Sequence, residues 1–290
     1  MLQVRWRGKW HGISDQKPRP TDRIGDIHTV EPHMTLLILK VTLTPLLIAA
    51  ATLAARRWGP AVGGWFAGLP LTSGPVSVFL AVEQTPAFAA SAARGTLLGL
   101  IAVASFCVAY ARSAKRSAWV RPTTLGLGFY SLVTWALLLS SFGLFVSTLL
   151  VLSVLGVALM ALGVPSSVDS GVPAPRWDLP VRMATATVMV LLITGAASSL
   201  GPEWSGLLSP FPVFACVMAI FSHRNGGAGA AHRLLRGVIL GSFAFASFFV
   251  VVGLLVQRLS LVFAYAVATS VALAVNGFSL AALLRRRRVV

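Results

Sequence analysis

Residues 59–75 read GPAVGGWFAGLPLTSGP, and residues 201–217 read GPEWSGLLSPFPVFACV. They open a gapless match of Gly59–Val108 with Gly201–Val250, which has fifteen identities in fifty positions at a spacing of 142 residues. Composition alone gives roughly four or five identities in so hydrophobic a chain. The identities that composition explains least are Gly59/Gly201, Pro60/Pro202, Gly64/Gly206, Pro70/Pro212, Arg94/Arg236, Gly95/Gly237 and Gly99/Gly241. The chain therefore contains an internal repeat.

The composition is that of a membrane protein. The 290 residues are 56% hydrophobic and 11% charged, with a mean hydropathy of +0.81. A soluble domain has about a quarter of its residues charged. From Met34 onward, apolar runs of roughly 20 residues recur, which is the length that crosses a bilayer as a helix. These runs are continuous and do not alternate, so the sequence predicts an all-α polytopic membrane protein and not a β-barrel.

Nine hydrophobic segments are expected along the chain. They are 34–55, 59–82, 87–111, 123–140, 142–163, 181–200, 201–222, 234–256 and 259–284. A linker rich in Pro, Ser and Gly, residues 164–180, divides a first transmembrane unit, 34–163, from a second unit, 181–290, which ends in a basic tail. Residues 1–33 form a polar extension with no signal-peptide pattern. Either Met34 is the natural start, or this extension is a disordered tail.

The net charge of +16 would indicate nucleic acid in a soluble chain. Here the Lys and Arg residues lie in short loops between apolar segments, where cytoplasmic retention of positive charge explains them. We therefore expect no nucleic-acid partner. If every segment crosses and the first begins outside, nearly all the loop charges become cytoplasmic, so we predict an inner-membrane protein of a bacterium, with the first span starting outside and the C-terminus inside.

The two repeats are expected to have opposite orientations. Five crossings separate matching points, and five is odd, so the second copy enters the membrane upside down relative to the first. The loop charges agree: the four cations after the third segment are matched by Arg258 alone after the eighth. The predicted fold is about nine transmembrane helices in two inverted-topology repeats, five plus four, each with a Gly/Pro-broken second helix.

The paired breaks are the first candidate site. Proline removes a helical donor and glycine allows the backbone to turn, so an unwound segment in the membrane exposes polar groups and helix dipoles to a solute. The candidate solute-binding residues are Gly68, Pro70, Thr72, Ser73, Gly74 and Pro75 in the first break and Ser209, Pro210 and Pro212 in the second. The alternative is that these prolines only kink helices for packing.

Arg94 and Arg236, at equivalent positions, are the second candidate. They could attract an anion, or their side chains could extend to the membrane surface. Each is followed by a Gly-x-x-x-Gly pattern, which allows close helix packing. We therefore expect the third and eighth segments to cross near the centre of the molecule and to bring the two Arg-bearing helices into contact.

Several chemical groups are missing from the predicted spans. No Asp or Glu falls inside a span, since Asp178 is assigned to the linker, and this argues against a proton relay. His223 and His232 are assigned to a Gly-rich cytoplasmic loop. Cys107 and Cys216 lie in apolar runs with no metal-ligand spacing, so neither a disulfide framework, a metal site nor a cofactor is expected.

The leading hypothesis is a secondary transporter, not an enzyme, that moves a small anionic or zwitterionic solute by alternating access around the two broken helices. In organisation the chain resembles the inverted-repeat carriers. Its expected partners are the lipid bilayer and the solute, and a homo-oligomer remains open. Two alternatives belong to other classes: a non-transporting membrane scaffold or assembly protein, and a lipid-modifying membrane enzyme.

Overall fold

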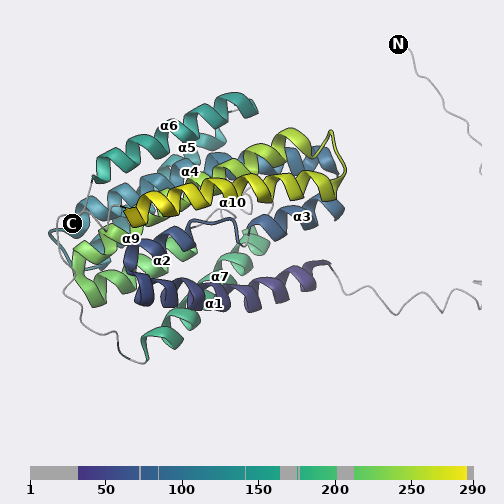
Figure 1. Cartoon of the computed structure of the whole chain (residues 1–290). Coiled ribbons are helices and arrows are strands. Elements are labelled where there is room, and N and C mark those ends of the chain that lie inside the picture. Colours follow the sequence, from purple (N-terminus) through teal and green to yellow (C-terminus); the bar gives the residue numbers. More distant parts are fainter. Residues whose placement is uncertain are drawn as a thin grey trace, which may run out of the picture.

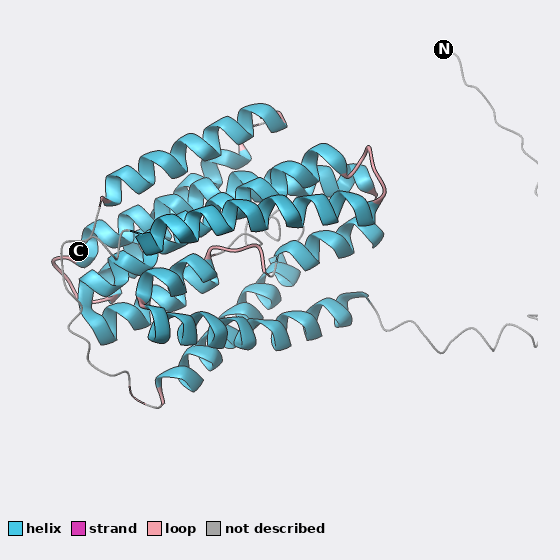
Figure 2. Cartoon of the chain, viewed as in Figure 1, coloured by secondary structure: helices cyan, strands magenta, loops and turns pink. Residues whose placement is uncertain are grey.

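The computed structural model describes residues 32–71, 73–83, 85–140, 142–163, 175, 177–200 and 212–285. Over these residues the chain forms helices joined by short loops, with no strand, as Figures 1 and 2 show. The helices are α1 (Pro32–Trp58), α2 (Pro60–Ala67), α3 (Ser73–Glu83), α4 (Pro86–Ala114), α5 (Val120–Leu138), α6 (Leu144–Leu162), α7 (Asp178–Leu200), α9 (Val213–Leu255) and α10 (Leu261–Arg285). The all-helical prediction is confirmed for the described residues.

Four of these helices are long and apolar enough to cross a membrane, namely α4, α6, α9 and the 261–281 part of α10. Their outward faces carry large apolar side chains: Phe145 and Met160 on α6 are 75% and 74% exposed, and Phe278 on α10 is 79% exposed. Contiguous apolar surface of this kind is unfavourable in water and favourable against lipid tails. The structure is therefore that of a membrane-embedded helical protein.

The first predicted break is present. The segment expected at 59–82 is divided into α2, which ends at Ala67, and α3, which begins at Ser73. Gly59 starts this region at φ 84°, a left-handed conformation that favours glycine, and Pro60 occupies the first helical position, where its missing N–H costs nothing. The second break lies mostly outside the described residues; α9 begins directly after Pro212.

Helix α9 corrects one prediction. The loop expected at residues 223–233 is much shorter than predicted, because α9 spans 43 residues as two helices that meet at Gly227, with His223 on the first helix and His232 on the second. Only Gly227 leaves the helical region, at φ 72° and ψ −175°. This positive φ favours glycine, and the second helix begins at once, with Ala231 fully buried.

The helix boundaries follow the 142-residue repeat. Gly227 lies 142 residues after Thr85, which caps the N-terminus of α4, so the kink in α9 falls where α3 gives way to α4 in the first copy. In the first copy α4 packs on α5. In the second copy their counterparts, the second part of α9 and α10, also pack on each other. Matching helices also contact one another directly, α1 with α7 and α4 with α9, while the unmatched α6 packs against α4 and α9.

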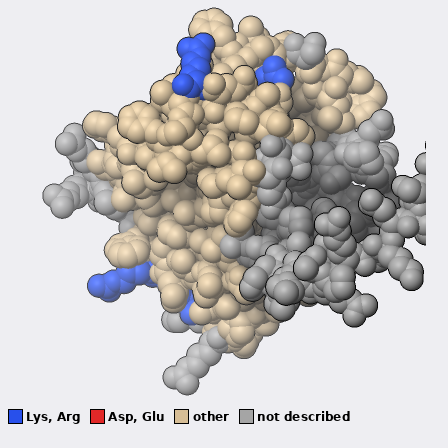
Figure 3. Space-filling model, turned by 90° about the vertical axis from the view of Figure 1, so that its right-hand side faces the viewer, with Lys and Arg blue, Asp and Glu red and all other residues tan. Residues whose placement is uncertain are grey.

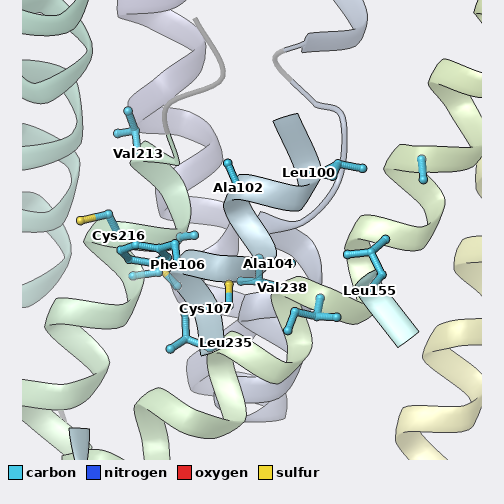
Figure 4. Close-up of a cluster of buried hydrophobic side chains, with 14 of the residues drawn as sticks. Leu100, Ala102, Ala104, Phe106, Cys107, Leu155, Val213, Cys216, Leu235 and Val238 are labelled. Atoms are coloured by element: carbon cyan, nitrogen blue, oxygen red, sulfur yellow. The ribbon is translucent and has the colours of Figure 1, made fainter. Parts of the chain in front are cut away.

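The core lies where α4 and α9 meet. Phe106 of α4 and Leu235 of α9 are fully buried there (Figure 4), and Tyr110 of α4 is fully buried in the same cluster. Cys107 and Cys216 lie in the same cluster as free, fully buried thiols. They therefore behave as small apolar side chains in this core.

Positive charge gathers at one end of the bundle, called here the basic end. Arg56 and Arg182 meet there at the end of α1 and the start of α7, and Lys115 at the end of α4 lies near His232 on α9. The Lys and Arg residues of this end are Arg56, Arg57, Arg112, Lys115, Arg116, Arg121, Arg182, Arg224, Arg233, Arg236 and Arg285. Figure 3 faces the opposite end and shows few Lys and Arg and no Asp or Glu among the described residues there.

Candidate functional site

The structure places the first break beside the start of α9. A small cavity of about 20 Å³ lies between Leu69 and Leu71 of the first break, Leu47 of α1 and Phe214, the second residue of α9. Phe214 follows Pro212 of the second break by two residues. The cavity has room for a single water molecule and for no larger solute. The first break therefore lies against the start of α9, with almost no free volume between them.

Two helix N-termini adjoin this cavity. Helix α3 starts at Ser73, two residues after the lining residue Leu71, and α9 starts at Val213, beside the lining residue Phe214. The first intrahelical bond of α9 is donated by the Cys216 amide to the Pro212 carbonyl, so the amides before Cys216 have no partner within the helix. A helix N-terminus carries a partial positive charge, so the start of α9 favours a negatively charged group at this cavity.

The backbone of the first break is partly satisfied within the break. The Gly68 amide bonds the Gly64 carbonyl at 3.0 Å, the Leu69 amide bonds the Phe66 carbonyl at 3.2 Å, and the Gly74 amide bonds the Pro70 carbonyl at 2.8 Å. Pro70 itself has no N–H. None of these four positions therefore offers an amide donor to a solute in this conformation.

The predicted residues of the first break differ in burial. Pro70, Ser73 and Pro75 are half-buried, and Gly74 is buried. A Cβ on Gly74 would lie 3.6 Å from the Phe248 ring, an ordinary contact, so neither crowding nor a left-handed φ requires glycine there. Thr72, Ser209 and Pro210, which were also predicted as site residues, lie outside the described residues.

Gly68 is required for helix packing. Its φ of −83° is open to any residue, but a Cβ there would meet the Val238 carbonyl and would lie 3.0 Å from the Gly241 Cα. On the same face of α2, a Cβ on Gly64 would meet the Leu234 carbonyl. Helix α2 therefore lies directly on α9, with backbone against backbone.

The glycines of α9 show the same contact with α2. They also correct the prediction that the Gly-x-x-x-Gly pattern of α9 packs against α4. A Cβ on Gly237 would meet the Ala61 carbonyl, and one on Gly241 would meet the Trp65 carbonyl. Gly95, the counterpart of Gly237 on α4, has no atom within 4 Å of a Cβ placed there. Helices α4 and α9 do touch, as expected, but the Gly-x-x-x-Gly pattern of α9 packs against α2 and not against α4.

The two predicted arginines are not brought together. Arg236 donates from Nε to the Gly163 carbonyl at 2.7 Å, at the C-terminal end of α6, where a cation is favoured by the helix dipole. Lys115, at the end of α4, lies near His232 and Arg236. Arg94 precedes Lys115 by 21 residues on α4, about 30 Å of helix rise. The two arginines therefore lie far apart along the bundle, although the helices that carry them touch as expected.

A buried carboxylate was missed in the sequence. Asp178, assigned to the linker, is the first residue of α7 and is 0% exposed. Its Oδ2 accepts from Arg182 Nε at 2.9 Å and from Arg56 Nη2 at 3.1 Å, and its Oδ1 accepts from Asn225 Nδ2 at 2.7 Å. This network joins α1, α7 and α9 at the basic end. The i,i+4 spacing of Asp178 and Arg182 was the one available sequence signal.

A second buried polar contact joins α3 to α10. The Tyr265 hydroxyl donates to the Ser77 carbonyl at 2.7 Å and lies 2.8 Å from the Ser77 hydroxyl. Ser77 is 5% exposed. Its hydroxyl is therefore occupied by Tyr265, and no sequence signal pairs these two residues, which are 188 positions apart.

No known protein family, characterised protein or solved structure matches this chain. Among the described residues, no group of three or more His, Cys, Asp or Glu side chains could hold a metal ion.

Proposed function

We propose that this chain is a secondary transporter of a small anionic or zwitterionic solute, with its binding site between the two breaks. The observation that carries the proposal is the cavity that Leu69 and Leu71 of the first break share with Phe214 in the first turn of α9, where α9 presents its N-terminus. Broken helices that point partial positive charge at a common point are typical of carriers for anionic substrates.

The charge around the helices supports an anion in preference to a cation. In the described residues the one fully buried carboxylate is Asp178, and it is already bonded to two arginines. Apart from Glu83 at the far end of α3, the described helices offer a cationic solute no other carboxylate. The solute class is therefore one with at least one negative group, such as a carboxylate.

The conformation described is a closed one. The cavity between the breaks admits about one water molecule, and the Asp178 network holds α1, α7 and α9 together at the basic end. A solute enters only when the breaks separate. Access alternates when one repeat tilts against the other and widens this space first toward one side of the membrane and then toward the other.

The repeats are inverted in this proposal. What supports inversion is that matching helices run in opposite directions in Figure 1, as α4 and the second part of α9 do. In addition, the end of α4 at Lys115 lies beside His232, near the start of that second part. The basic end is the cytoplasmic one, because positive charge is retained on that side, and the host membrane is a bacterial inner membrane.

The test is solute flux into vesicles that contain the purified full chain. Labelled small carboxylates and amino acids are screened, and then Leu71→Trp, which fills the space between the breaks, is compared with Leu132→Trp on α5, which is 59% exposed. We expect flux of at least one solute, abolished in Leu71→Trp and retained in Leu132→Trp. Folded protein that moves none of the solutes, or equal flux in both variants, would contradict the proposal.

A further inference from the structure

A groove separate from the breaks lies on the outer surface of the bundle. It is formed by α1, α2 and α10 and has a volume of about 470 Å³. Its walls include Leu53, Ala54, Val62 and Leu280, and Arg57 and Trp58 stand at its mouth. On one side the Trp65 indole N–H donates to the Ser279 hydroxyl at 2.9 Å, which fixes α2 against α10. The groove is therefore a preformed feature of the fold.

The size of the groove fits one hydrocarbon chain. A protein cavity of about 150 Å³ holds one benzene molecule, which has six carbons, so 470 Å³ holds on the order of 18 carbons. This is the length of a common lipid tail. Ala50, also in the lining, lies seven residues before Arg57, about 10 Å deeper along α1. Leu46 continues the apolar strip beyond it and is 62% exposed.

The mouth of the groove carries unneutralised positive charge. Arg56 is paired with Asp178 at 3.1 Å, whereas its neighbour Arg57 is exposed, with no hydrogen bond or ion pair to a described residue. Trp58 beside it is 55% exposed. Tryptophan is enriched at the level of lipid headgroups, and a Lys or Arg near a headgroup phosphate attracts anionic lipid. The groove thus combines an apolar channel with a cationic, aromatic entrance.

We propose that the α1–α2–α10 groove binds one anionic phospholipid, with an acyl chain between α1 and α2 and the phosphate at Arg57. The apolar channel accounts for the tail, and the charge at its mouth selects the headgroup. Because α2 is also the helix packed on the glycines of α9, the lipid lies against an element that touches both repeats. This binding does not depend on whether the chain transports a solute.

Native mass spectrometry of the full chain in mild detergent tests the proposal. The protein is delipidated and incubated with phosphatidylglycerol or phosphatidylcholine that carry the same acyl chains. We expect phosphatidylglycerol to be retained preferentially. Arg57→Gln should reduce that preference about fivefold, and the matched variant Arg258→Gln, at the opposite end, should leave it unchanged. Leu53→Trp, which fills the groove from an exposed position, should reduce retention of both lipids.

The headgroup and the tail assignments can be overturned separately. Equal lipid preference in Arg57→Gln and Arg258→Gln would overturn the headgroup assignment, and full lipid retention in Leu53→Trp would overturn the tail assignment. A lipid-free dimer that Leu53→Trp dissociates would show that a second copy of this chain occupies the groove instead. Thermal unfolding of each variant in the same detergent confirms that the readout concerns folded protein.

Discussion

Asp178 at the start of α7 and Arg56 near the end of α1 form a 3.1 Å ion pair across 122 residues of sequence. The carboxylate is 0% exposed and the arginine side chain 35% exposed. Burial of a carboxylate is tolerated here because Arg182 and Asn225 satisfy it as well. This single residue therefore determines how α1, α7 and α9 are held at the basic end.

Asp178→Asn should destabilise the protein strongly. It leaves Arg182, itself 5% exposed, buried without its counter-charge. Loss of one partner of a buried pair costs about 3–5 kcal/mol. Arg56→Gln should cost less than about 1 kcal/mol, since Arg56 is partly solvated. Thermal unfolding in detergent measures both, and a similar loss in the two variants would show that Asp178 does not organise the network.

The glycine contact between α2 and α9 gives a matched pair of variants. Gly237→Ala should destabilise by about 1–3 kcal/mol, because the added methyl group meets the Ala61 carbonyl and forces the helices apart. Gly95→Ala, at the equivalent repeat position, meets no atom and should be neutral or slightly stabilising. Unfolding midpoints of the two variants check this, and equal midpoints would contradict the packing described.

Tyr265→Phe should destabilise more than Ser77→Ala does. Removal of the tyrosine hydroxyl leaves both the Ser77 carbonyl and the Ser77 hydroxyl without this partner, at a cost of about 1–3 kcal/mol. Ser77→Ala keeps the bond to the carbonyl and should cost about 1 kcal/mol. The unfolding midpoints of the two variants test this. A lower midpoint for Ser77→Ala would show that the hydroxyl–hydroxyl hydrogen bond contributes more than the bond to the Ser77 carbonyl.

Single cysteines test the proposed orientation. Ser117 lies between α4 and α5 at the basic end, and Ser260 lies between α9 and α10 at the opposite end. Native Cys107 and Cys216 are buried, so they should not react. In intact cells a membrane-impermeant thiol reagent should label Ser260→Cys at once and Ser117→Cys only after permeabilisation. Labelling of Ser117→Cys in intact cells would reverse the orientation.

Local sequence signals were enough to predict the first break. Gly68, Pro70 and Pro75 lie within or beside the gap between α2 and α3, because each of them acts on its own stretch of backbone. The Gly-rich stretch of α9 likewise predicted a turn, and the chain turns there at Gly227, whose positive φ favours glycine. The sequence did not show how short this turn is, because Ala230 and Ala231, which begin the second helix, are buried by tertiary packing.

Partner choice could not be derived from the sequence. The pattern at Gly237 and Gly241 predicts that some backbone approaches closely, but the identity of α2 as that backbone depends on the whole fold. The burial of Asp178 likewise depends on Arg56 of α1 and Asn225 of α9, which are far from it in sequence. Such contacts are set by tertiary packing, whereas breaks and hydrophobic segments are set locally.

The backbone contact at Gly64 and Gly68 has a mechanical consequence. No side chain lies between α2 and α9 at these glycines to be compressed or to slide, so the two helices must move as one body. Helix α3 is joined instead to α10 and α4. When the two repeats tilt against each other, α2 therefore travels with the second repeat, although its sequence belongs to the first.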